Sequence, residues 1–241
     1  MLKTNQEWIH WGKTDPLWAV SSMPGRQAGE ARAWTDEEFL AEGQEYFAPV
    51  RAQWEHYGMG SAHCLEIGAG SGRLTKQLLA RFDRVTAVDV SAAQLENAQR
   101  LLGDDAKRAT FAVVDAPAFP VLDASADGLF TAEVFQHFND FAPIEAYLSD
   151  GFRALCSGGT ACFQLPVIGM HPVNHFRFRL RAIRTTIERF VGRNGVMEYR
   201  FHQAARVLTT LSRIGYADCQ LRAFNVGAHG GHHAYFFARK P

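Results

Sequence analysis

A glycine-rich turn and one acidic residue carry most of the chemistry that this sequence predicts. The turn reads Gly-Ala-Gly-Ser-Gly over residues 68–72 and follows the apolar run 64–67. Asp89 ends a second apolar run roughly 20 residues further on, the spacing of a nucleoside-binding unit. A turn without bulky side chains lets the backbone approach a nucleoside closely, and the carboxylate can accept hydrogen bonds from its ribose. The pattern therefore predicts a nucleoside-binding site.

Two charged residues beside the turn indicate which kind of nucleoside it binds. In a dinucleotide fingerprint, G-x-G-x-x-G, a helix N-terminus receives a pyrophosphate. Here Arg73 occupies the place of the third glycine, and Glu66 lies two residues before the first. The Glu66 carboxylate would repel a pyrophosphate but can accept hydrogen bonds from an ammonium group. A cationic ligand such as the methionine end of S-adenosylmethionine is therefore favoured.

Residues 65–72, Leu-Glu-Ile-Gly-Ala-Gly-Ser-Gly, resemble the first motif of class I S-adenosylmethionine-dependent methyltransferases. In that family an acid after the second strand binds both ribose hydroxyls, and an acid after the third strand faces the adenine amino group. Asp89 and Asp115 match these two positions, and the resemblance extends over residues 60–166. It implies S-adenosylmethionine as cofactor. It also implies the cofactor-binding residues Glu66, Gly68, Ala69, Gly70, Arg73, Asp89, Val90, Asp115, Ala116 and Glu133.

Local structural roles are the alternative for two of these acids. Asp89 could simply precede a helix, because Ser91 and Gln94 form a capping box just beyond it. Asp115 precedes Ala-Pro-Ala and could serve only to shape a turn.

His137 is the candidate catalytic residue. Methyl transfer from a sulfonium is an in-line displacement, and a hydroxyl acceptor must lose its proton as the new bond forms. A histidine, with an ordinary pKa of about 6.5, is suited to take that proton. His137 lies just beyond the predicted fourth strand, at the sheet edge where ligands of open parallel sheets gather. The alternative is that His137 anchors its loop. Asp140, beside Asn139, could bind a divalent cation. The four-residue spacing of His171 and His175 also suits two metal ligands, but no third ligand is evident, and no metal site is predicted.

The elements that would position these residues alternate between strands and helices from residue 63 onward. Strands are expected near 63–67, 84–89, 110–114, 127–132 and 159–165, with helices near 72–81, 91–101, 142–155 and 203–213. A final pair of strands is expected near 217–224 and 233–239. This order predicts an α/β fold with a Rossmann-like, mostly parallel sheet and helices on both faces. The family resemblance implies seven strands and an antiparallel C-terminal hairpin.

Two segments lie outside this minimal fold. Residues 1–60 are expected to form a cap, with a loop-rich start and then a helix that runs from a Thr35–Glu38 capping box to about Tyr57. Residues 61–241 form the cofactor-binding domain, interrupted by an insertion at about 167–202. The insertion is expected to be a solvated amphipathic helix, with a lid for an anionic group or a homodimer contact as alternatives. Its arginines include Arg177, Arg179, Arg181, Arg184, Arg189 and Arg193.

Aromatic and histidine side chains outside the motifs are expected to play structural roles. The family resemblance implies that such an N-terminal segment covers the cofactor and substrate. Packing on the sheet is nevertheless expected for most of its aromatic residues, which include Trp8, Trp11 and Trp18. His232 and His233 are expected to lie exposed in the turn of the final hairpin.

The composition excludes several classes of function. The 241 residues are 47% hydrophobic, the formal net charge is zero and the pI is about 7.2. This balance predicts neither a nucleic-acid nor a membrane partner. The N-terminus has no apolar signal-peptide core, and the four cysteines show no C-x-x-C spacing. A cytoplasmic enzyme is therefore expected.

The expected function is methyl transfer to a small-molecule acceptor, with a hydroxyl group of a sugar or specialised metabolite favoured. Residues 132–135 read Ala-Glu-Val-Phe, which lacks the proline-proline signature of many enzymes that methylate amino groups of nucleic acids and proteins. Three alternatives stay open: a small-molecule N-methyltransferase, a nicotinamide-dependent oxidoreductase and a non-catalytic binding module. Glu66 and the missing third glycine disfavour the oxidoreductase.

Overall fold

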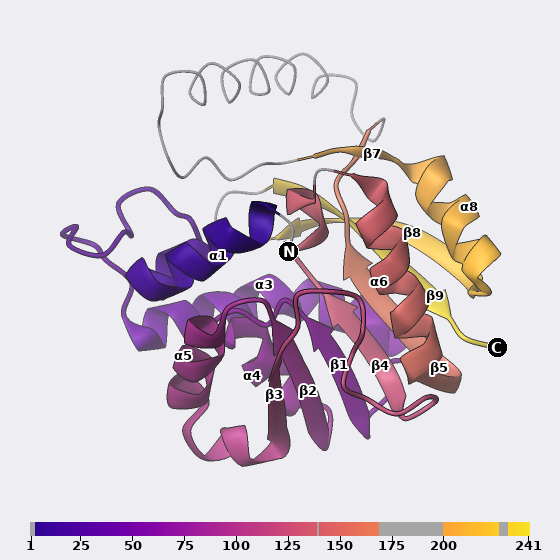
Figure 1. Ribbon diagram of the computed structural model, residues 1–241, viewed down its shortest axis with the longest axis horizontal. Coiled ribbons are helices and arrows are strands. Elements are labelled where there is room, and N and C mark those ends of the chain that lie inside the picture. Colours follow the sequence, from indigo (N-terminus) through magenta and orange to yellow (C-terminus); the bar gives the residue numbers. More distant parts are fainter. Residues whose placement is uncertain (1–2, 139, 169–199, 227–230) are drawn as a thin grey trace.

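A seven-stranded sheet organises the computed structural model, which describes residues 3–138, 140–168, 200–226 and 231–241 (Figure 1). The strand order is β3-β2-β1-β4-β5-β9-β8. Strand β9 runs antiparallel to the other six strands, which are parallel to one another. The predicted mostly parallel sheet with an antiparallel C-terminal hairpin is confirmed. The strands are β1 (His63–Ile67), β2 (Arg84–Asp89), β3 (Ala109–Val113), β4 (Ala126–Thr131), β5 (Leu155–Gln164), β8 (Ala217–Val226) and β9 (Gly231–Arg239).

Helices cover both faces of this sheet, as predicted. One apolar cluster joins the sheet to α3 (Asp36–Tyr57), α4 (Arg73–Leu79) and α5 (Ala92–Leu102). The other joins the opposite face to α6 (Phe141–Ala154) and α8 (Ala204–Ile214). Because β1 pairs with β2 on one side and β4 on the other, the strand order reverses at β1. Ligands of open α/β sheets bind at the carboxyl ends of the strands at such a reversal.

The N-terminal segment differs from the expected loop-rich start. It forms two helices, α1 (Lys3–Thr14) and α2 (Pro16–Val20), before the predicted helix α3. The dipeptide Asp15-Pro16 indicates a loop in sequence, but here Asp15 caps α2 by accepting a hydrogen bond from the Trp18 backbone N–H at 3.4 Å. Pro16 is the first residue of α2, where a missing N–H costs nothing. The predicted Thr35–Glu38 capping box of α3 is confirmed.

The start of β5 also differs from the prediction. The sequence predicts a strand near 159–165 after a helix near 142–155, but α6 ends at Ala154 and β5 begins directly at Leu155. Gly158 has φ +80° and lies inside the strand, where the pairing with β4 shifts register. Its N–H donates to the carbonyl of Lys240 at 2.8 Å, so the C-terminal end of the chain pairs with this irregular stretch.

The described ends of the insertion pair with each other. The short strands β6 (Val167–Ile168) and β7 (His202–Gln203) lie parallel to one another. Of the arginines in the insertion, the six from Arg177 to Arg193 lie outside the described residues. Among the helices described, none combines the length and the apolar composition that crossing a bilayer requires.

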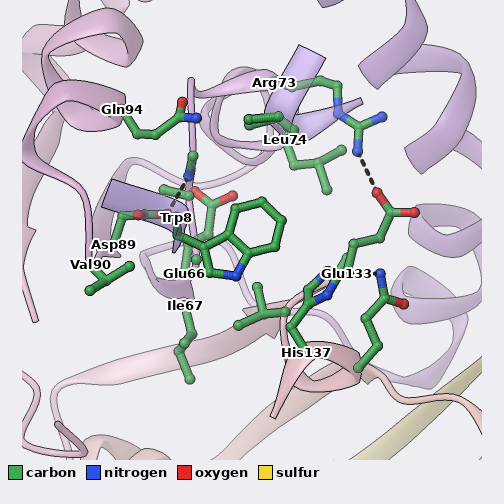
Figure 2. A pocket seen from close by; sticks show the side chains of 18 of the residues that line it. Trp8, Glu66, Ile67, Arg73, Leu74, Asp89, Val90, Gln94, Glu133 and His137 are labelled. Atoms are coloured by element: carbon green, nitrogen blue, oxygen red, sulfur yellow. Dashed lines mark hydrogen bonds and ion pairs between the residues drawn. The ribbon is translucent and has the colours of Figure 1, made fainter. Parts of the chain in front are cut away.

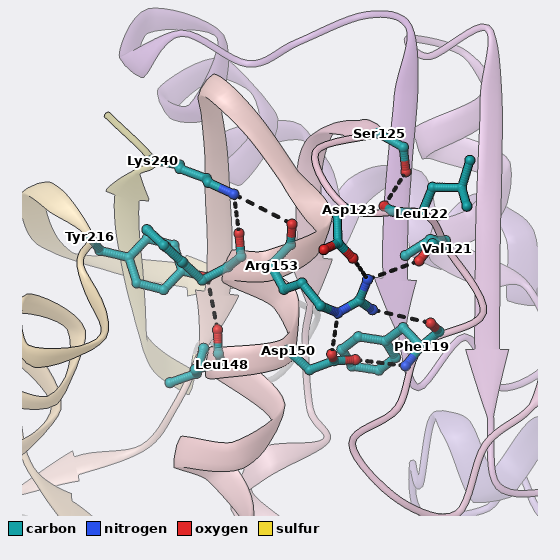
Figure 3. Close-up of polar contacts among 11 residues, drawn as sticks. Phe119, Val121, Leu122, Asp123, Ser125, Leu148, Asp150, Arg153, Tyr216 and Lys240 are labelled. Atoms are coloured by element: carbon teal, nitrogen blue, oxygen red, sulfur yellow. Dashed lines mark hydrogen bonds and ion pairs between the residues drawn. The ribbon is translucent and has the colours of Figure 1, made fainter.

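Arg153 fixes the loop that connects β3 to β4 onto α6 (Figure 3). Its guanidinium donates to the carboxylates of Asp123 and Asp150, both at 2.6 Å, and to two carbonyls of that loop. The second oxygen of Asp150 accepts the Phe119 N–H at 2.6 Å. The network therefore holds the backbone that leads to Val114 and Asp115.

We expect Arg153→Met to lower the free energy of unfolding by about 1–2 kcal/mol, because several hydrogen bonds to a charged group are lost at a partly exposed site. Urea unfolding followed by circular dichroism measures this change. Lys107→Met removes an exposed ion pair with Asp104 and is the matched control, with an expected change below about 0.5 kcal/mol. Equal stability losses in the two variants would contradict the role assigned to Arg153.

Candidate active site

The glycine turn follows β1 and brings its backbone against the end of β2. The N–H groups of Gly68 and Ala69 both donate to the carbonyl of Val88, at 2.8 and 3.0 Å. Gly68 and Gly70 have φ of +74° and +52°, a region that favours glycine. A Cβ at Gly68 would collide with Val134, and one at Gly70 with Val20. The backbone at these two glycines therefore packs directly against neighbouring side chains and leaves no room for a Cβ atom.

Asp89 connects this turn to the start of α5. One carboxylate oxygen accepts the Gly70 N–H at 2.8 Å, and the other accepts the Ser91 N–H at 2.9 Å. Burial raises the pKa of the Asp89 carboxyl, while these backbone hydrogen bonds lower it. Ser91 also caps α5, accepting the Gln94 N–H at 3.4 Å. The other half of the predicted capping box is replaced, because the Ser91 N–H donates to Asp89. The Asp89 carboxylate therefore orders the turn and the start of the helix, and the residue also lines the cavity described below.

Glu66 is a buried carboxyl at the end of β1. It accepts a hydrogen bond from the Thr75 hydroxyl at 2.6 Å. Burial raises the pKa of Glu66 to about 7, with a smaller contribution in the same direction from the charge of Asp89. The charge of Glu66 is therefore costly in the empty site, and a cationic ligand would relieve that cost.

Arg73 lies at the start of α4 and is paired with two acids from distant parts of the chain. Its guanidinium donates to Glu42 of α3 and, at 3.1 Å, to Glu133 beyond β4. The guanidinium also stacks 4.8 Å from the centre of the Tyr46 ring. Its Nε is buried without a hydrogen-bond partner. Of these three neighbours, only Glu133 is predicted from the sequence as a site residue.

Glu133 follows β4 in an unusual backbone conformation. Its φ is +60°, and its N–H donates to the side-chain carbonyl of Gln164 on β5 at 3.0 Å. Strained residues of this kind concentrate at functional sites. The conformation places the Glu133 carboxylate at the same end of the site as Arg73 (Figure 2).

His137 lies in the short helix η2 (Phe135–His137) and is almost fully buried. Its Nε2 lies 3.2 Å from the side-chain amide nitrogen of Gln136. Because an amide nitrogen only donates, Nε2 accepts this hydrogen bond and the neutral ring carries its proton on Nδ1. The ring of Trp8 packs edge-on against His137, with the ring centres 4.7 Å apart.

These side chains surround one cavity of about 380 Å³, within the range that holds small ligands. It contains most of the residues predicted for the site. The predicted residues that line it are Glu66, Gly68, Ala69, Gly70, Arg73, Asp89, Val90, Glu133 and His137.

Asp115 and Ala116 are the predicted residues that the structure does not bring into the cavity wall. Both are exposed, and the preceding residue, Val114, lines the cavity instead. The carbonyl of Asp115 accepts a hydrogen bond from the Asn5 side chain at 3.4 Å. The N-terminal helix therefore contacts this turn directly.

The cavity has further walls beyond the predicted site residues. The cap contributes Asn5, Trp8 and residues 19–23, none of which is predicted individually as a site residue. His233 also lines the cavity, and with His232 it belongs to strand β9 rather than to an exposed turn. Within the described residues, no three His, Cys, Asp or Glu side chains come together as a metal site.

Sequence comparison identifies a methyltransferase domain. Residues 64–159 match a family model with that description, and this segment runs from β1 into β5. No curated protein sequence matches the chain.

Solved structures share the fold over most of the chain. The N-methyltransferase NodS of Bradyrhizobium japonicum WM9, solved with S-adenosyl-L-homocysteine, is 16% identical, with full coverage of both chains and a TM-score of 0.62. The phosphoethanolamine N-methyltransferase 2 of Haemonchus contortus, solved with S-adenosyl-L-methionine, is 18% identical with a TM-score of 0.60. That match covers 86% of this chain, which spans only 57% of the Haemonchus enzyme.

A third similar structure belongs to a different class of enzyme. The [4+2]-cyclase SpnF is 16% identical, with a TM-score of 0.62 over 99% of this chain and 96% of its own. Identities this low show a shared fold alone, so the reaction has to be argued from the cavity.

Proposed function

We propose that this chain, whose residues 64–159 match a methyltransferase domain, is a class I S-adenosylmethionine-dependent methyltransferase that binds S-adenosylmethionine in the cavity and transfers its methyl group to a small molecule. The observation that carries the proposal is the presence of two acids on either side of a glycine-rich turn without bulky side chains. Asp89 provides carboxylate oxygens for a ribose, and buried Glu66 provides an anion for an ammonium group. A negative charge on Glu66 would repel a pyrophosphate, which disfavours the nicotinamide-dependent alternative.

The proposed arrangement assigns each end of the cavity to one part of the methyl donor. The ribose lies at Asp89, and the adenine lies beyond it toward Val90. The methionine end lies near Glu66, with Arg73 as the partner of its carboxylate; the Nε of Arg73 has a hydrogen bond to offer. The adenine role predicted for Asp115 and Ala116 stays a prediction, because neither lines the cavity.

We propose oxygen as the attacking atom. The hydroxyl oxygen forms a bond to the methyl carbon while the carbon–sulfur bond breaks and leaves its electron pair on sulfur. The hydroxyl proton passes to Nε2 of His137 when the Gln136 amide turns away from it. Holding the oxygen, carbon and sulfur in line lowers the barrier by up to ~7–11 kcal/mol. The products are S-adenosylhomocysteine and a methyl ether.

A mass-spectrometric screen tests this proposal. The protein is incubated with S-adenosylmethionine and a panel of hydroxylated and amino metabolites, and products are searched for the mass of one added methyl group. Methylated alcohols support oxygen as the acceptor atom, whereas methylated amines favour the N-methyltransferase alternative. Protection against thermal unfolding by NAD, but not by S-adenosylhomocysteine, would overturn the proposal.

We expect His137→Ala to lower turnover of the acceptor found in that screen by about 100-fold or more, the usual contribution of a general base. Because His137 follows β4 whereas the proposed ribose partner Asp89 ends β2, affinity for S-adenosylhomocysteine should change less than about threefold. Steady-state kinetics and titration calorimetry measure the two quantities. The control is exposed His56 of α3, whose replacement by alanine should change neither. Unchanged turnover in His137→Ala would leave His137 as the anchor of its loop.

The proposal includes a location and an assembly state. We place the enzyme in the cytoplasm, consistent with four free cysteines, of which Cys64 and Cys162 are buried. A homodimer contact through the insertion stays a prediction.

A further inference from the structure

One face of α1 spans the cavity and fixes Trp8 above it. Asn5, Trp8 and Gly12 are three and four residues apart, so they share one face of the helix. At one end, the Asn5 side chain donates to the carbonyl of Asp115 at 3.4 Å. At the other end, Gly12 packs so closely on α5 that a Cβ there would collide with the Ser91 hydroxyl. Trp8 lies between these two anchors.

The indole of Trp8 lies across the middle of the cavity. Figure 2 shows the indole between Asp89 on one side and Arg73 and Glu133 on the other, and all four residues line the cavity. The ring of His137, 4.7 Å away between centres, supports it from below in this view. The indole is therefore positioned over the centre of the cavity, where the two halves of an elongated ligand join.

We propose that Trp8 recognises the positive charge of the sulfonium, so that the site prefers the methyl donor over the demethylated product. This inference rests on the proposed function. If Asp89 holds the ribose and the Glu66 end holds the methionine part, the sulfur that links them lies beneath the indole. The negative face of an aromatic ring attracts onium cations, and the attraction is larger in desolvated sites.

The proposed interaction distinguishes the methyl donor from its product, because their sulfur atoms differ in charge. The sulfur of S-adenosylmethionine is a cation, whereas that of S-adenosylhomocysteine is a neutral thioether. Both ligands share the adenosine and the amino-acid end, so contacts with Asp89 and Glu66 are common to both. An attraction between Trp8 and the charge on sulfur strengthens donor binding alone and favours release of the product.

Titration calorimetry with S-adenosylmethionine and S-adenosylhomocysteine tests the inference through the ratio of the two affinities. We expect Trp8→Leu to shift that ratio toward the product by about 5- to 30-fold. Trp8→Phe keeps an aromatic ring of lower negative potential and should give an intermediate ratio. Because the ratio is measured within one variant, a general loss of folded protein lowers both affinities and leaves it unchanged.

Trp11→Leu is the matched control. Trp11 lies on the same helix, packs against Trp18 and does not line the cavity, so its loss should preserve the wild-type ratio. An unchanged ratio in Trp8→Leu, or an equal shift in Trp11→Leu, would overturn the role of Trp8. A wild-type protein that binds neither ligand would instead overturn the proposed function.

Discussion

Replacing Asp89 with asparagine should lower the affinity of the protein for S-adenosylmethionine by about 100-fold or more. Hydrogen bonds to a charged group contribute about 1.5–3 kcal/mol each, and the two hydroxyls of a ribose would donate two of them. An asparagine also brings an NH₂ group toward the N–H of Gly70 or Ser91, which now donate to the carboxylate at 2.8 and 2.9 Å. Titration calorimetry measures the affinity.

The control for this substitution is Asp83→Asn. Asp83 is exposed in the turn before β2 and does not line the cavity, so its replacement should leave the affinity unchanged. Thermal unfolding without ligand separates a loss of binding from a loss of fold. Wild-type affinity in a folded Asp89→Asn protein would remove the ribose from Asp89 and with it the main support for the proposed function.

The part of the site that could be predicted from sequence is local in the chain. The strand, the turn and the following helix fix where Glu66, Gly68 and Asp89 lie, because few backbone paths connect consecutive parallel strands. The turn glycines adopt the positive φ that their type suggests. Spacing alone was therefore sufficient to place these residues in one cavity.

The partners of Arg73 show why the rest could not be predicted. Arg73 pairs with Glu42, 31 residues earlier, and with Glu133, 60 residues later. A sequence pattern indicates which face of α3 is apolar, but it does not indicate which element that face meets. The position of Glu42 depends on the packing of α3 against α4, where Gly43 allows the backbones to approach around Arg73.

The N-terminal cap and Asp115 illustrate the same limit. The tryptophans of the cap are predicted to pack on the sheet. In the structure, however, α1 packs against α5 and its Trp8 side chain lines the cavity. The motif spacing of Asp115 fits its family position, but here the side chain is exposed and the neighbouring helix binds its carbonyl. Both outcomes depend on how α1 docks, and no local signal in the sequence encodes that docking.

Replacing Glu66 with glutamine should stabilise the empty protein and weaken the binding of S-adenosylmethionine. The pKa of Glu66 is raised from its ordinary value of 4.5 to about 7, so the folded protein holds a proton that the unfolded chain releases. The free energy of unfolding therefore falls as the pH rises from about 4.5 to 7, and the loss is complete above that range. A glutamine does not titrate and avoids this loss, which amounts to about 3 kcal/mol at pH 8.

The same titration predicts how binding depends on pH. In the wild-type protein, affinity for S-adenosylmethionine should decline as the pH falls below about 7, because a protonated Glu66 no longer attracts an ammonium group. Glu66→Gln should bind more weakly than wild type at pH 8 by about tenfold or more, and its affinity should depend less on pH between 6 and 8.

Urea unfolding and calorimetry at pH 5 and pH 8 test the expected changes in stability and affinity, with exposed Glu96→Gln of α5 as control. Stability lost at pH 8 in Glu66→Gln, or affinity equal to wild type, would contradict a buried anion that awaits a cationic ligand. Stability and affinity therefore change in opposite directions in Glu66→Gln. A buried charge on Glu66 destabilises the protein without ligand, and the ammonium group of the ligand would neutralise that charge.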